Sequence, residues 1–179
     1  MTAKPATVTI NRAPVLTLWA AVVVERLGFE RDEALTLGRA VAGLNAYAKG
    51  VSLGLFEPTP AAVKAERKKA RTPGGFQVAL LGRAVPAVLT AEGVRATAKQ
   101  KPIAPGSVER YLVSKFGDAL GDARRAMTAL ARSLPPKELA LSAFRLYEQF
   151  RPTVPAGAGG WGAKGKLDLR KLEGLGRGG

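Results

Sequence analysis

Five basic side chains stand close together in one short stretch of the sequence. They are Lys64, Arg67, Lys68, Lys69 and Arg71. Lysine offers a mobile point charge, and the arginine guanidinium offers a fork of donors that fits a phosphate group. Clustered cations attract polyanions and raise the rate at which they meet the protein. The stretch is therefore a candidate phosphate-binding segment.

Two further groups of cations follow along the chain. The first contains Arg83, Arg95, Lys99 and Lys101, and the second contains Lys164, Lys166, Arg170 and Lys171. Residues 61–101 and 151–179 together hold fifteen Lys and Arg against four Asp and Glu, which accounts for +11 of the formal net charge of +14. Such clustering is typical of nucleic-acid-binding proteins, although solvated basic loops are the simpler alternative.

Trp161 stands among glycines and lysines in the second group. An exposed tryptophan beside cations can stack on a nucleic-acid base, a contact worth about 1–3 kcal/mol. Large aromatic side chains are more often buried, so Trp161 could instead anchor the tail on the helices. We therefore include it among the candidate nucleic-acid-binding residues, with its exposure left open.

The usual signs of an enzyme site are missing or incomplete. The chain has no His and no Cys, which removes the commonest general base and every thiolate nucleophile. Residues 157–162 have the spacing of a dinucleotide-binding loop, but too few residues follow to build its helix and strand. Asp118 and Asp122 could share a helix face and bind Mg²⁺, although their position favours helix capping. We expect a non-enzymatic protein with no cofactor and no metal site.

A mainly α architecture must position the basic groups. The sequence predicts two small helical units, joined by a basic segment and a short β-hairpin and followed by a flexible Gly-rich tail. The expected divisions are an N-terminal helical unit over residues 1–57, a basic arm over 58–75, the hairpin region over 76–101, a three-helix unit over 102–151 and the basic tail over 152–179.

The apolar run over residues 15–24 predicts a buried helix from Arg12 to Arg26. The run is too short to cross a bilayer, so we expect no membrane partner. A second helix follows over residues 32–48, and Gly38 and Gly43 lie inside it. Glycine destabilises a helix interior by about 1 kcal/mol relative to alanine, which indicates either a close backbone contact or a break at these positions.

The hairpin region contains the turn sequence Ala91-Glu92-Gly93, in which the glycine is expected to adopt a positive φ. Pro86 lacks an N–H and therefore predicts that its strand lies at a sheet edge. Further on, Ser107 is the expected N-cap of the first C-terminal helix. In the tail, Asp168 is expected to cap one short helical turn.

These observations predict a DNA-binding protein of low sequence specificity, in the manner of nucleoid-associated proteins, that grips phosphates through the arm, the hairpin and the tail. DNA is favoured over RNA because no aromatic platform for single strands is visible. The alternative is an all-α protein–protein interaction module whose basic segments dock an acidic partner or keep the chain in solution. A protein partner or a homo-oligomer is compatible with either. The absence of cysteine fits a reducing compartment and hence a cytoplasmic location.

Overall fold

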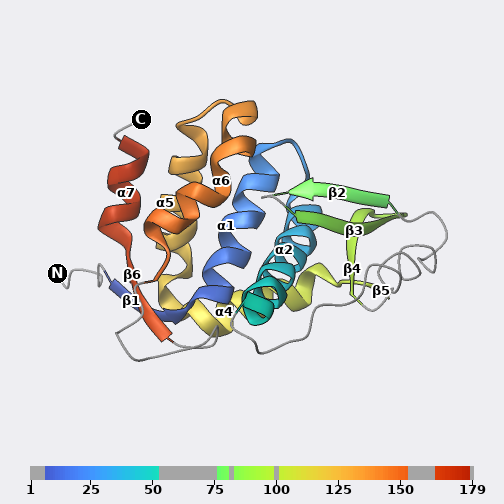
Figure 1. Ribbon diagram of the computed structural model, residues 1–179, viewed down its shortest axis with the longest axis horizontal. Helices are drawn as coiled ribbons and strands as arrows, with labels where there is room; N and C mark the ends of the chain where they lie inside the picture. The colour runs from blue at the N-terminus through green and yellow to red at the C-terminus, as the bar shows by residue number, and fades with distance from the viewer. Residues whose placement is uncertain (1–6, 53–75, 81–82, 99–100, 153–163, 178–179) are drawn as a thin grey trace.

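The computed structural model is rich in helix and carries two small antiparallel sheets (Figure 1). It describes residues 7–52, 76–80, 83–98, 101–152 and 164–177. The elements are β1 (Thr7–Asn11), α1 (Arg12–Arg26), α2 (Arg31–Ser52), β2 (Phe76–Leu80), β3 (Arg83–Thr90), β4 (Gly93–Ala98), β5 (Lys101–Pro102), α4 (Pro105–Phe116), the 3₁₀ turn η1 (Gly117–Ala119), α5 (Leu120–Arg132), α6 (Pro136–Phe150), β6 (Lys164–Asp168) and α7 (Leu169–Arg177). None of the described helices is long and apolar enough to span a membrane.

Helix α1 lies at the centre, with α2 on one side and α5 and α6 on the other (Figure 1). Its sequence is apolar on every side, and all residues from Pro14 to Val24 are buried. Trp19 fixes the contact with α6, since its indole Nε1 donates a hydrogen bond of 2.8 Å to the Ala143 carbonyl oxygen. The buried helix predicted from the sequence is confirmed with the same bounds.

Helix α2 crosses α1 at Gly38. A Cβ atom at this position would lie 2.7 Å from the Ala21 backbone nitrogen and 2.8 Å from the Thr17 carbonyl oxygen. The glycine therefore allows the two helix backbones to touch. Of the two explanations expected for a glycine inside this helix, a close backbone contact or a break, the first holds at Gly38. Gly43 has no atom within 4 Å of such a Cβ, and α2 continues past it without a break.

The larger sheet has the strand order β2–β3–β4–β5, and α2 packs against it. Gly93 has a φ of 120°, as the predicted turn requires. The edge position predicted for the strand of Pro86 is wrong, because β3 pairs on both sides. Its pairing with β4 ends at Ala87, so the missing N–H of the proline is not needed there.

Two side chains of α2 cover the backbone of β4. Glu33 Oε2 accepts a hydrogen bond of 2.8 Å from Val94 N, and Thr36 Oγ1 accepts one of 3.1 Å from Ala96 N. The other carboxylate oxygen of Glu33 accepts from the Glu30 N–H at the start of α2. Because strand β5 is only two residues long, these contacts satisfy donors that the sheet leaves unpaired.

One hydrophobic cluster contains buried residues of both the N-terminal and the C-terminal helices. It joins Leu16 and Leu37 to Leu112 and Leu139, among others. Helix α4 begins at Pro105 rather than after Ser107, whose hydroxyl donates to the Ala104 carbonyl oxygen inside the first turn. The expectation that Ser107 is the N-cap is therefore wrong.

The last described segment, residues 164–177, forms a strand and a helix, whereas most of the tail stretch predicted to be flexible lies outside the described residues. Strand β6 pairs antiparallel with β1, and α7 follows it directly and packs against α5. Leu167, Leu169 and Leu172 are buried and attach this segment to the core. The helical turn predicted after Asp168 is thus part of a packed helix. Residues 153–163 lie outside the described part of the chain.

Candidate anion-binding surfaces

The sequence-predicted cations fall into three sets in the structure. The arm residues Lys64, Arg67, Lys68, Lys69 and Arg71 lie outside the described residues, as do Lys99 and Trp161. Arg83 belongs to β3 and Lys164 to β6, and for these two residues the structure describes only the backbone. The side chains of the remaining candidates are described, and they are Arg95, Lys101, Lys166, Arg170 and Lys171.

Arg95 differs from the other candidates because it is buried, with only 8% of its surface exposed. Its Nη1 donates a hydrogen bond of 2.9 Å to the neighbouring Val94 carbonyl oxygen, and its charge lies near Glu33. A guanidinium held in this way is not free to reach a phosphate at the surface. The structure therefore removes Arg95 from the candidate phosphate-binding residues. Lys101, on β5, is exposed.

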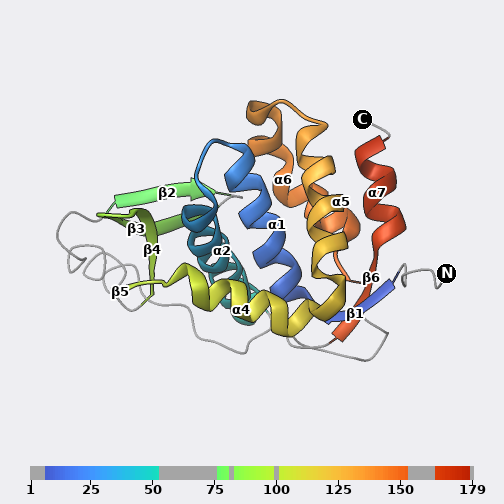
Figure 2. The same ribbon diagram turned by 180° about the vertical axis from the view of Figure 1, so that it is seen from behind.

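The exposed candidates lie at opposite ends of the long axis. Strand β5, which carries Lys101, is at one end, and β6 with α7 is at the other, in both views (Figures 1 and 2). The central helices stand between these ends. The described members of the predicted set thus do not gather on one continuous surface.

Strand β6 and the first turn of α7 hold three exposed cations, Lys166, Arg170 and Lys171, which we call the tail cluster. Lys166 pairs with Thr9 on the outward side of the β1–β6 ribbon, while its neighbour Leu167 is buried. None of the three forms an ion pair with a residue that the structure describes.

The start of α7 is electrostatically unusual. Asp168 Oδ1 accepts backbone hydrogen bonds of 3.0 Å from Arg170 N and 3.2 Å from Lys171 N, so the predicted capping role of Asp168 is confirmed. The first turn of the helix carries no acidic residue, and two of its residues are cations. Cations near a helix N-terminus oppose the helix dipole, whereas anions there are favoured by about 0.3–1 kcal/mol. The Asp168 carboxylate supplies the favourable anion at this helix end, and the two cations exceed its charge by one.

Two more cations near the β1–β6 ribbon are Arg12 and Arg151. Arg12 follows β1 directly, and its Nε donates a hydrogen bond of 3.1 Å to the Pro152 carbonyl oxygen. Burial lowers the pKa of the Arg12 guanidinium, and the neighbouring charge of Arg151 lowers it further. Two guanidinium groups that repel each other add positive potential to the end of the molecule where β6 begins.

Three other arginines on the described surface, Arg31, Arg124 and Arg125, form ion pairs. Glu109 on α4 accepts from Arg124 of α5 at 2.8 Å and from Arg31 of α2 at 3.5 Å, and the hydrogen bond from Arg124 is the main reason that the pKa of Glu109 is lowered. Arg125 pairs with Asp122 within α5. These side chains tie helices together or stabilise a helix surface, and they leave little charge for an external anion.

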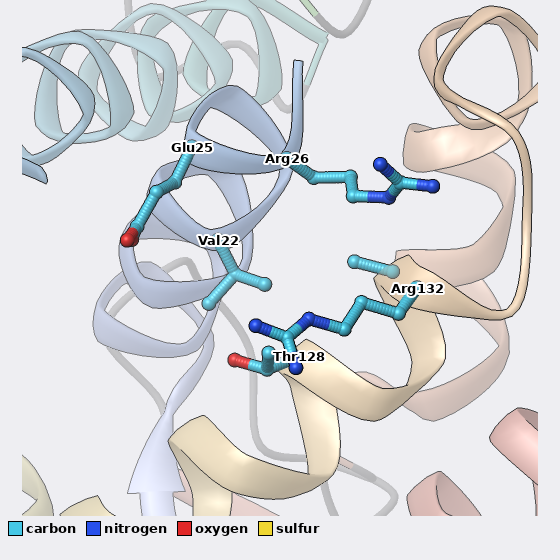
Figure 3. A pocket seen from close by; sticks show the side chains of 6 residues that line it. Val22, Glu25, Arg26, Thr128 and Arg132 are labelled. Carbon is cyan, nitrogen blue, oxygen red and sulfur yellow. The ribbon is translucent and has the colours of Figure 1, made fainter. Parts of the chain in front are cut away.

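A separate pocket lies between α1 and α5. It has a volume of about 290 Å³ and is lined by Val22, Glu25, Arg26, Thr128, Ala131 and Arg132. In Figure 3 the Arg26 and Arg132 side chains cross the gap in opposite directions, one from each helix, while the carboxylate of Glu25 points away from both. The pocket is thus a second place where cations gather.

Comparison of the chain with protein families, with curated proteins and with solved structures finds no match. The chemistry of the described residues therefore carries the functional argument.

Sequence reasoning overlooked both arginine pairs, Arg12 with Arg151 and Arg26 with Arg132. Each of these arginines lies at or beside a helix end, and a basic residue at a helix C-terminus is ordinary. The sequence offered one indication of these arginines, namely that each stands at or beside the end of a predicted helix. These arrangements arise from tertiary packing, because α1 must lie against α5 and α6 before arginines from separate helices can share one region.

Proposed function

We propose that this chain is a non-enzymatic protein that binds the phosphate backbone of nucleic acid, with the tail cluster as its rigid contact surface. One observation carries the proposal: Lys166, Arg170 and Lys171 are exposed, unpaired with described carboxylates and held on an ordered strand and helix. Ordered cations lose less conformational entropy on binding than cations on a flexible tail. The like-charged pair of Arg12 and Arg151 adds to the potential at the same ribbon.

The expected ligand is duplex DNA rather than single-stranded RNA. Single-strand recognition relies on exposed aromatic side chains that stack on bases. Of the largest aromatic side chains in the described residues, Trp19 and Tyr147 are fully buried, and Tyr111 is partly buried with the Arg39 guanidinium over its ring. Contacts made only by lysine and arginine fix a protein on the phosphates without reading the sequence. We therefore propose low sequence specificity, with the arm over residues 58–75 as a further contact.

The salt dependence of DNA binding tests the proposal. We would change Lys166, Arg170 and Lys171 together to Gln and measure the affinity for a duplex oligonucleotide between 50 and 200 mM salt. Three lost phosphate contacts should reduce the slope of log K against log salt by about 2.7. Circular dichroism before and after the change would show that α7 is retained.

A matched variant separates the cluster from the total charge. Lys115, Lys137 and Arg145 are exposed cations on α4 and α6, so their joint change to Gln removes the same charge elsewhere. This control should alter the slope much less than the tail variant. Equal effects of the two variants would show that only the net charge matters, and absence of binding at 50 mM salt would refute the proposal outright.

No observation favours the protein-interaction alternative. The large hydrophobic side chains exposed in the described residues are Leu89, Val113 and Leu141, and they belong to β3, α4 and α6. Isolated exposed leucines and valines are normal on protein surfaces and do not form a docking patch.

A further inference from the structure

The pocket between α1 and α5 is lined by two arginines, one from each helix. Arg26 is the last residue of α1, and Arg132 is the last residue of α5. Both line the pocket, and their side chains run in opposite directions across it (Figure 3). Glu25, the one acidic residue of the lining, directs its carboxylate away from them.

The protein leaves most of the hydrogen-bonding capacity of these arginines unused. Arg26 Nη2 donates one hydrogen bond, of 3.3 Å, to the Leu134 carbonyl oxygen, while Nε is buried and bonds to no described atom. Arg132 makes no hydrogen bond or ion pair with any residue that the structure describes. Buried donors are normally satisfied, and an exception calls for a partner from outside the chain.

We propose that this pocket binds the phosphate group of a small phosphorylated molecule. A phosphate monoester carries a charge of about −1.5 to −2 at neutral pH, which balances the two guanidinium groups, whereas a single carboxylate would balance only one. Arginine forks pair with phosphate oxygens through parallel hydrogen bonds. The Thr128 hydroxyl on the same wall offers a further donor, and Val22 and Ala131 supply apolar surface for the rest of the ligand.

The size of the pocket favours a small ligand rather than a polymer. Its volume of about 290 Å³ is at the lower end for small-molecule sites. The walls come from the packed helices α1 and α5, from which the two arginine side chains extend. The inference does not depend on the proposed binding of nucleic acid, because the tail cluster contributes no residue to this pocket.

Calorimetric titration of the full chain with inorganic phosphate and with glycerol 3-phosphate, at constant ionic strength, tests the assignment. We expect saturable binding with a Kd below about 1 mM, and tighter binding of the ester if the apolar wall contributes. The affinity should fall at least tenfold in R132Q and should be unchanged in R145Q, which removes an exposed arginine from α6 outside the pocket. Glycerol 3-phosphate should also bind more weakly at pH 5 than at pH 7.5, because protonation near pH 6 removes part of its charge.

R132Q is the primary variant because the Arg132 side chain supports no described contact, whereas R26Q also removes the hydrogen bond to Leu134. Three results would overturn the inference: acetate that binds as tightly as phosphate, equal affinity of phosphate for R132Q and the unaltered chain, or no saturation below about 10 mM ligand. R132Q should keep its affinity for duplex DNA within about twofold. Failure of the pocket and failure of the nucleic-acid proposal are therefore seen in different measurements.

Discussion

Replacing Gly38 with alanine should destabilise the protein, although alanine is the better helix former. The added Cβ would stand 2.7 Å from Ala21 N and 2.8 Å from the Thr17 carbonyl oxygen, and both atoms belong to the backbone of α1. Backbone atoms of a packed helix cannot rotate away as a flexible side chain can. The two helices would have to separate by roughly 0.6–0.7 Å to restore ordinary contact distances of about 3.4 Å.

The size of the effect follows from two opposing contributions. Alanine in place of glycine gains about 1 kcal/mol of helix propensity. Overpacking of a well-packed core loses about 1–3 kcal/mol or more, and here the crossing of the central helix with α2 is affected. We expect a net loss of about 2 kcal/mol in the free energy of unfolding for G38A, which lowers Tm by about 4–8 °C for a chain of this length.

Gly43 supplies the matched control on the same helix. It is exposed, and nothing lies within 4 Å of a Cβ built on it. G43A should therefore raise the free energy of unfolding by up to about 1 kcal/mol. Urea unfolding followed by circular dichroism at 222 nm gives both values by linear extrapolation. A G38A variant as stable as the unaltered chain would refute the close helix crossing.

Two further perturbations address the sheet and the tail. Hydrogen bonds from Glu30 N and Val94 N lower the pKa of Glu33, so its stabilising contribution is complete above the unfolded value of about 4.3 and is lost as pH falls through the lower folded value. The difference in unfolding free energy between the unaltered chain and E33Q should therefore shrink between pH 7 and pH 3 in urea titrations, and a constant difference would contradict the assignment. L172A removes a fully buried side chain and should weaken the attachment of α7 by about 2–5 kcal/mol, seen as faster amide exchange in α7 and lower DNA affinity at unchanged net charge. L141A, at a leucine that is 83% exposed, should change neither quantity.

Local sequence patterns predicted helices and turns better than they predicted which strands pair with each other. The apolar run of α1 and the turn before Gly93 depend on neighbouring residues, and both are found where the sequence places them. The role of Pro86 depends on which strands pair with β3, and that is decided by distant segments. The tail shows the same limit. Local signals predicted a helical turn after Asp168 but not strand β6, whose partner β1 lies more than 150 residues earlier in the chain.

The functional prediction was limited in the same way, because the net charge of a segment does not determine which of its cations are exposed. Arg95 and Lys101 belong to the same predicted basic region, yet Arg95 is buried and Lys101 is exposed. Strand alternation does not account for this difference, because Arg95 and Ala96 are both buried and both residues of β5 are exposed. The difference follows from the position of α2 beside β4. Arg170 and Lys171 became candidates for a stronger reason than their charge, since Asp168 and the buried leucines fix them at the start of α7.

The separation of the exposed candidates along the long axis constrains how a polyanion can be held. Cations at opposite ends cannot grip the same few phosphates, so any contact made by Lys101 must be made to a different part of the polymer than the contact made by the tail cluster. Two such contacts reinforce each other only if the polymer is long enough to reach both. The tail variant should therefore reduce affinity for a short duplex and for a long duplex alike, whereas Lys101→Gln should matter only for the long one. Binding of both lengths with equal sensitivity to Lys101→Gln would show that the two ends act on one site.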